Sequence, residues 1–152
     1  MTQARSVTCA SFTLERSYPV TPSQLYKALT DSAAKAKWFA ASSDCTVLVR
    51  ELDLRVGGRE LVKGRWSSGM VSTFDAVYHD IVPNERLIYC YALYLDERKI
   101  SVSLATMELS KAGSETTLKL TEQGAFLDGY DDAGAREHGT GLLLDALGAS
   151  LN

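Results

Sequence analysis

The length, composition and charge of the chain set the first limits on its fold and partners. Its 152 residues suit one domain with one core, so we expect a single domain over residues 1–152. A formal net charge of −3 without a dense run of Lys or Arg argues against nucleic acid or an anionic membrane surface as the main partner. No apolar run approaches the ~18 residues of a membrane-spanning helix.

The first residues and the cysteines predict the cellular compartment of the protein. The first six residues lack the apolar segment of a secretory signal. Cys9, Cys45 and Cys90 are widely spaced and odd in number, which favours reduced thiols. We therefore expect a cytoplasmic protein in which these cysteines are small buried side chains on strands.

The first part of the chain predicts one strand followed by two short helices. Residues 7–18 alternate apolar and polar side chains, which is typical of a half-buried strand. Thr21 can cap the next helix, with Gln24 as its partner in a capping box. Residues 30–32 then interrupt that helix and offer a cap for a second helix over residues 33–39.

The middle of the chain predicts six strands joined by short turns. The Gly57-Gly58 pair marks one of these turns, because glycine reaches positive φ without a steric cost. Since every connection is short, strands that are neighbours in sequence should pair antiparallel. The expected strands are residues 46–50, 60–66, 71–82, 86–95, 99–110 and 116–122.

The last part of the chain predicts a loop and then a long amphipathic helix. Residues 124–134 have the glycines and acidic side chains of a loop, and Leu143, Leu147 and Leu151 then recur every four residues. An antiparallel meander needs one face covered, and this helix is long enough to lie across it. The order predicts an α+β fold in which a curved antiparallel sheet wraps around the C-terminal helix, with space for an apolar pocket between them.

Short motifs along nearly the whole chain resemble the START-like (SRPBCC) superfamily, in the branch named after the activator of heat-shock protein 90 ATPase homologue. These motifs are Arg16 and Pro19, residues 25–31, Trp38-Phe39, residues 53–58, residues 81–87, Gly139 and residues 144–147. The resemblance implies a helix-grip (START/Bet v-like) fold. It implies a fold more firmly than a function, since most members of the branch have no assigned activity.

Two positions depart from the usual pattern of that branch. Trp38-Phe39 stands where members often carry two tryptophans, and Gly139-Thr140 stands where they commonly carry Gly-Trp. The second departure places a small hydroxyl side chain, instead of an indole, at the mouth of the expected cavity.

Aromatic side chains and a few polar ones are the candidates for a ligand site. In a helix-grip fold such aromatics either fill the core or line a pocket. Arg55 and His138 are expected near the mouth, where they would orient a ligand. The candidate ligand-binding residues are Trp38, Phe39, Arg55, Trp66, Phe74, Tyr91, Phe126, His138, Thr140, Leu143 and Leu147.

The sequence predicts no metal site, no cofactor and no catalytic residue. His79 and His138 lack metal-ligand spacing, and Gly57-Gly58 belongs to no phosphate-binding motif. A helix N-terminus stabilises nearby carboxylates, which accounts for Asp131 and Asp132, with Asp128 nearby. His138 is the one candidate acid or base at the mouth, although a surface or capping role is favoured.

The strand expected over residues 86–95 is apolar on both faces. A strand with one face in solvent should alternate with polar residues. A second subunit over the outer face explains this pattern, and we therefore hypothesise a homodimer.

The leading functional hypothesis is a small cytoplasmic protein that binds an apolar or amphipathic small molecule between the sheet and the C-terminal helix. The first alternative is a cyclase-, aromatase- or hydrolase-type enzyme of the wider superfamily, which needs a pair of titratable side chains deep in the pocket. The sequence offers no convincing pair. The second alternative is a co-chaperone that stimulates a chaperone ATPase, as the branch name implies; the partner-binding N-terminal domain of the eukaryotic activator is not found in the sequence.

Overall fold

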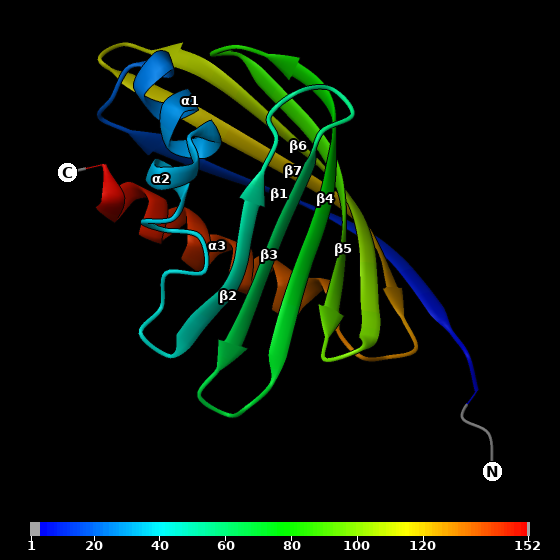
Figure 1. Ribbon diagram of the computed structural model, residues 1–152. Coiled ribbons are helices and arrows are strands. Elements are labelled where there is room, and N and C mark those ends of the chain that lie inside the picture. The colour runs from blue at the N-terminus through cyan, green and yellow to red at the C-terminus, as the bar shows by residue number, and fades with distance from the viewer. Residues whose placement is uncertain (1–3, 152) are drawn as a thin grey trace.

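The computed structural model describes residues 4–151, which form a seven-stranded antiparallel sheet and three helices (Figure 1). The elements are β1 (Val7–Tyr18), α1 (Pro22–Thr30), α2 (Ser32–Lys35), β2 (Cys45–Leu52), β3 (Arg59–Trp66), β4 (Val71–Val82), β5 (Arg86–Leu95), β6 (Arg98–Ala112), β7 (Glu115–Leu127) and α3 (Ala133–Ser150). In this part of the chain, no helix is long and apolar enough to cross a membrane.

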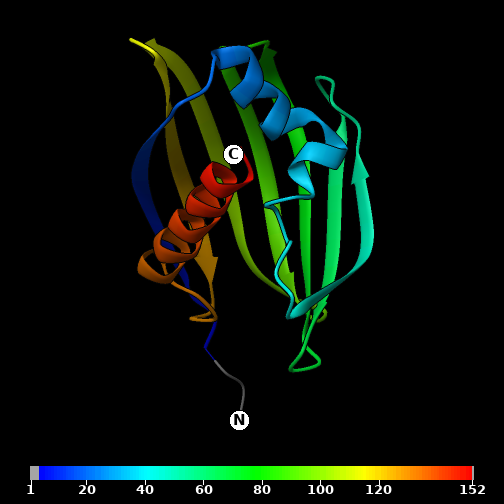
Figure 2. The ribbon, with the colours of Figure 1, turned by 90° about the vertical axis from the view of Figure 1, so that its left-hand side faces the viewer.

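The strands form a meander that is completed by the first strand. The order across the sheet is β1-β7-β6-β5-β4-β3-β2, so β2 to β7 each pair with their neighbours in sequence, as predicted. Strand β1 pairs antiparallel with β7, with Phe12 opposite Glu122. The sheet curves, and α3 lies across its concave side together with α1 and α2 (Figure 2).

The helix starts follow the local sequence signals. At α1, the Gln24 amide donates to Thr21 Oγ1 at 3.2 Å and the Thr21 amide donates to Gln24 Oε1 at 2.8 Å, which confirms the capping box. The second helix is shorter than the predicted range 33–39 and ends at Lys35. The chain then continues as turns to Ala40, whose φ is 56°. Within these turns, the Trp38 indole donates to the Ala28 carbonyl of α1 at 2.9 Å.

The predicted loop over residues 124–134 was wrong at both ends. Strand β7 continues to Leu127, and α3 already begins at Ala133. Gly124 is a strand residue at a close approach, since a Cβ there would lie 3.0 Å from Ser103 Oγ and 3.0 Å from the Phe126 ring. A glycine that permits close packing looks the same in the sequence as a glycine that makes a turn.

The Gly57-Gly58 turn is confirmed, while the expectation for the cysteines holds only in part. Gly57 has a φ of 83°, and a Cβ on Gly58 would collide with the carbonyl oxygen of Asp53. All three cysteines lie on strands, but Cys9 is exposed and Cys45 and Cys90 are half-buried. Cys9 is exposed because it points away from the concave side near the free end of edge strand β1, where no helix covers it.

Candidate functional site

A cavity of about 560 Å³ lies between the sheet and the helices, within the ~300–1,000 Å³ typical of ligand pockets. Its sheet wall comes from β3 to β7, because alternate side chains of each strand point to the concave side. Its helical walls come from the end of α1, from α2 and the turns after it, and from α3, which contributes Thr140, Leu143 and Leu144.

Aromatic rings form a continuous surface on the sheet side of this cavity. The Phe74 ring lies 5.0 Å from the Phe39 ring and 4.8 Å from the Tyr91 ring, measured between centroids. Strand pairing places Tyr78 opposite Tyr89, with their rings 5.4 Å apart. Packed rings at these separations stabilise each other beyond their simple burial, so this wall is preformed.

A buried ion pair stands at the α2 end of the cavity. Lys35 Nζ donates to Glu60 Oε1 at 2.8 Å, and the Tyr78 hydroxyl donates to the same oxygen at 2.8 Å. Lys35 Nζ also lies 4.7 Å from the centre of the Phe39 ring. Burial, together with the Glu60 carboxylate, raises the pKa of Tyr78, so this hydroxyl remains a neutral donor.

A second buried ion pair anchors the start of α3. Arg136 Nη1 donates to the Tyr91 hydroxyl at 2.8 Å and to Glu122 Oε2 at 3.3 Å. Arg136 Nη2 donates to Ser101 Oγ at 2.7 Å and to Asp131 Oδ2 at 3.0 Å. The Tyr91 hydroxyl in turn donates to Glu122 Oε2 at 2.8 Å. One guanidinium therefore joins α3 to β5, β6 and β7.

Sequence reasoning missed these two clusters: it found no convincing pair of titratable side chains, and the structure places two such pairs at the cavity. The alternation of buried and exposed side chains along β3 and β7 was the signal for the two buried carboxylates. Glu122 occupies the same side of β7 as Leu118, Leu120 and Phe126, all of which are buried. Glu60 likewise shares a side of β3 with the buried Val62. A carboxylate on the buried side of a strand needs a buried cation as its partner. Only the fold shows that these partners are Lys35 and Arg136.

The structure brings most of the predicted ligand-binding residues to the cavity. Those that line it are Trp38, Phe39, Trp66, Phe74, Tyr91, Thr140 and Leu143. Phe126 is buried beside it, with its ring centre 5.3 Å from the Arg136 guanidinium, and Leu147 is fully buried in the core.

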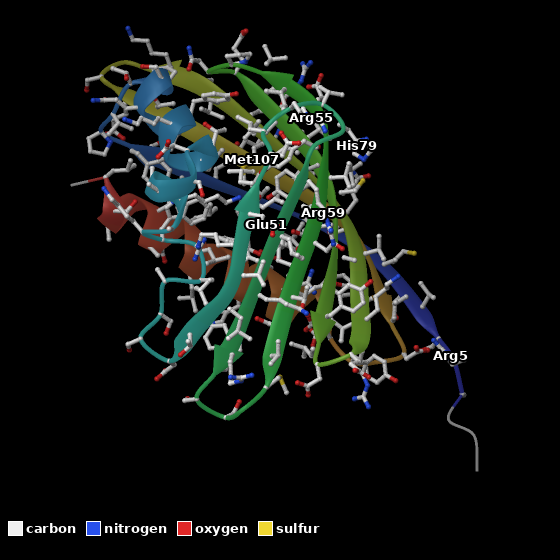
Figure 3. All side chains as sticks on the ribbon, viewed as in Figure 1. Arg5, Glu51, Arg55, Arg59, His79 and Met107 are labelled. Carbon is white, nitrogen blue, oxygen red and sulfur yellow. The ribbon has the colours of Figure 1, made fainter. Side chains whose placement is uncertain are left out.

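Arg55 and His138 do not line the cavity. Arg55 is exposed in the turn between β2 and β3, where it pairs with Asp53 at 2.8 Å. It lies with His79 at the end of the sheet away from α3 (Figure 3). His138 is exposed on α3. Both were expected at the mouth because the sequence does not show which turn or helix face closes the pocket.

The acidic residues before α3 serve the local structure. Asp132 caps α3 by accepting from the Ala135 amide at 2.9 Å. Asp128 accepts from Arg5 Nε at 3.0 Å and from the Ser6 amide at 2.9 Å. Over residues 4–151, no group of three or more His, Cys, Asp or Glu side chains is placed to hold a metal ion.

A curved antiparallel sheet that grips one long helix, with a cavity between them, defines the helix-grip class of fold. The chain belongs to the family described as activator of Hsp90 ATPase homolog 1-like protein, whose model matches residues 19–152. The resemblance to this branch of the START-like superfamily, predicted from the sequence, is thereby confirmed. Among curated proteins, no sequence matches the chain.

Solved structures of similar proteins share the architecture. An uncharacterized protein from Rhizobium leguminosarum is 38% identical, with 97% of each chain covered and a TM-score of 0.93. The Mll3558 protein from Rhizobium loti is 39% identical over 95% of this chain and 99% of its own, with a TM-score of 0.87. An AHSA1-like protein from Aeromonas hydrophila is 18% identical over 93% and 92% of the two chains, and its TM-score of 0.71 shows a shared fold.

Proposed function

We propose that the chain acts in the cytoplasm, as one domain, to bind an apolar or amphipathic small molecule in the cavity between the sheet and α3. The observation that carries this proposal is the cavity itself, which is about 560 Å³ and walled mainly by aromatic and aliphatic side chains. Burying about 300 Å² of apolar ligand surface contributes roughly 7 kcal/mol before the cost of association.

The two buried ion pairs support a binding role, because they hold the cavity walls in place without a ligand. The Lys35–Glu60 pair joins α2 to β3, and Arg136 joins α3 to the opposite half of the sheet. A preformed cavity loses little conformational entropy when a ligand enters, so more of the burial energy appears as affinity.

Titration with the neutral fluorescent dye Nile red tests this proposal. We expect saturable enhancement of its emission with the native protein. Leu143→Trp, which fills the cavity, should abolish the enhancement, whereas Leu142→Trp should preserve it, because Leu142 is 57% exposed on the same helix. Equal binding by both variants, or no binding by the native protein, would refute the proposal.

Acid–base catalysis on a bound molecule is a second candidate function. It is favoured by one observation: the side chains of Glu122, Arg136 and Tyr91 converge on the same cavity as Lys35 and Tyr78. An enzyme releases an altered molecule and a binding protein releases it unchanged. Mass spectrometry distinguishes the two functions. It would be applied to any small molecule extracted from the purified protein, before and after incubation with fresh protein and with Glu122→Gln.

We also propose that the chain forms a homodimer through the outer face of the sheet. The outer residues of β5, such as Cys90 and Ala92, are apolar and half-buried. They pair with the exposed Val77 on β4 and Val102 on β6, respectively. Light scattering at micromolar concentration should give a dimer mass that Val102→Asp reduces to a monomer, while Val56→Asp in an exposed turn leaves the dimer intact. A monomer mass for the native protein would refute this proposal.

A further inference from the structure

We propose that the cavity selects uncharged ligands that carry a neutral oxygen, in the form of an alcohol, phenol or carbonyl group, and that the Tyr89 hydroxyl binds this oxygen. The inference deepens the proposed binding function and rests on it. It depends on which polar groups of the cavity already have partners within the protein.

Tyr89 differs from the two tyrosines on either side of it. The hydroxyls of Tyr78 and Tyr91 donate to Glu60 and Glu122, at 2.8 Å each. The Tyr89 side chain lines the same cavity and is 8% exposed, yet its hydroxyl has no hydrogen-bond partner among residues 4–151. The hydroxyl is not among the fully buried side-chain atoms of residues 4–151 that lack a partner, so it reaches the open space of the cavity. A ligand that fills this space would leave the hydroxyl unpaired, which weakens binding, unless a ligand oxygen accepts from it.

The Tyr89 ring packs among the rings that form the sheet wall. Its ring centre lies 5.4 Å from that of Tyr78, 6.2 Å from that of Tyr91 and 6.3 Å from that of Phe74. A ligand whose apolar body packs against this wall can therefore bring a polar end to Tyr89 without placing it in the solvent.

The charges of the cavity leave no place for an ionised ligand. Lys35 is paired with Glu60 at 2.8 Å, and Arg136 is paired with Glu122 and Asp131. A carboxylate ligand would meet cations that are already neutralised and would approach two buried carboxylates. A ligand cation would find Glu60 already paired with Lys35 and Glu122 already paired with Arg136. The remaining carboxylate, Asp131, shares Arg136 and is 20% exposed, so water competes there with a ligand cation. Desolvation of either ion would thus go uncompensated, which excludes both fatty acids and amines as the best ligands.

Tyr89 offers a proton to the ligand throughout the physiological pH range. Burial raises the pKa of its hydroxyl well above the ordinary value, and Tyr91, Glu122 and Glu60 nearby act in the same direction. The neutral phenol is a hydrogen-bond donor, so its natural partner is an oxygen that accepts.

Three naphthalene probes that differ at one substituent test the inference. They are 2-naphthol, which is neutral at neutral pH; 2-methylnaphthalene, which has no polar group; and 2-naphthoate, which is an anion. We expect the native protein to bind 2-naphthol more tightly than either of the others, with 2-naphthoate weaker by about tenfold or more.

The Tyr89→Phe variant isolates the hydroxyl. It should weaken the binding of 2-naphthol by about three- to tenfold, the effect of one net hydrogen bond, and leave 2-methylnaphthalene unchanged. Tyr94→Phe is the matched control, because Tyr94 lies on the same strand and borders the outer side of the sheet. Since Tyr89→Phe breaks no hydrogen bond within the described protein, its thermal midpoint should equal that of the native chain.

The outcomes separate this inference from the proposed function. If Nile red and 2-methylnaphthalene bind but Tyr89→Phe leaves 2-naphthol unaffected, or if 2-naphthoate binds as tightly as 2-naphthol, the selectivity inference is overturned while the binding function stands. If neither Nile red nor any naphthalene probe binds, both are overturned. Should Tyr89→Phe fail to fold, the ranking of the three probes on the native protein decides by itself.

Discussion

Lys35 and Glu60 form an ion pair of 2.8 Å in the interior, where their side chains are 6% and 3% exposed. Removing one partner leaves the other charge buried, which typically costs about 3–5 kcal/mol, whereas removing both leaves no unpaired charge. Lys35→Met should therefore lower the free energy of unfolding by about 3 kcal/mol, and Lys35→Met with Glu60→Met should be more stable than the single variant.

Urea denaturation measures both effects, with Lys63→Met on the exposed side of β3 as the control. The exposed Lys63 has no such role, so its replacement should change stability by less than about 0.5 kcal/mol. If Lys35→Met and Lys63→Met proved equally stable, the ion pair would not hold α2 against the sheet.

The Lys35–Glu60 pair also shows which features cannot be predicted from the sequence. Local signals such as the Thr21–Gln24 capping box, and the alternation along the strands, were read correctly because each depends on residues that are close in sequence. The Lys35–Glu60 pair depends on the packing of α2 against β3, which no local pattern specifies. Phe126 was assigned to a loop for a similar reason: its strand partners, Thr8 and Ser101, are distant in the chain.

Ser103 provides a test of the buried polar groups. Its hydroxyl is fully buried and is the only such side-chain atom between residues 4 and 151 without a hydrogen-bond partner. Ser103→Ala removes an unsatisfied group and should raise the free energy of unfolding by about 1 kcal/mol. Ser101→Ala, two residues earlier on the same side of β6, should instead lower it, because the Ser101 hydroxyl accepts from Arg136. Chemical denaturation of both variants tests this contrast, and destabilisation by Ser103→Ala would contradict it.

Asp128 predicts a pH-dependent contribution to stability. Arg5, which donates to its carboxylate, together with the Ser6 amide, lowers the pKa of Asp128 below the ordinary value. A group whose pKa is lowered by folding stabilises the protein at pH values above its unfolded pKa, which is about 3.9. That contribution is lost as the pH falls through the lowered pKa of the folded state.

Asp128→Asn removes the charge and suits the backbone, since residue 128 has a φ of 55° and asparagine tolerates this region. At neutral pH the variant should melt below the native protein, and the two melting temperatures should converge as the pH falls below about 4. Melting curves over this range check the prediction. A difference that stays constant with pH would show that the ion pair with Arg5 does not contribute.

Thr140 tests whether the mouth of the cavity limits access. It lines the cavity from α3 and is half-buried. Thr140→Trp should place an indole in the entrance and weaken the binding of Nile red by about tenfold, which corresponds to about 1.4 kcal/mol. Ala149→Trp is the control, because residue 149 is exposed near the end of the same helix and does not line the cavity. The titration used for the native protein measures both variants, and equal affinities would show that Thr140 does not border the path of the ligand.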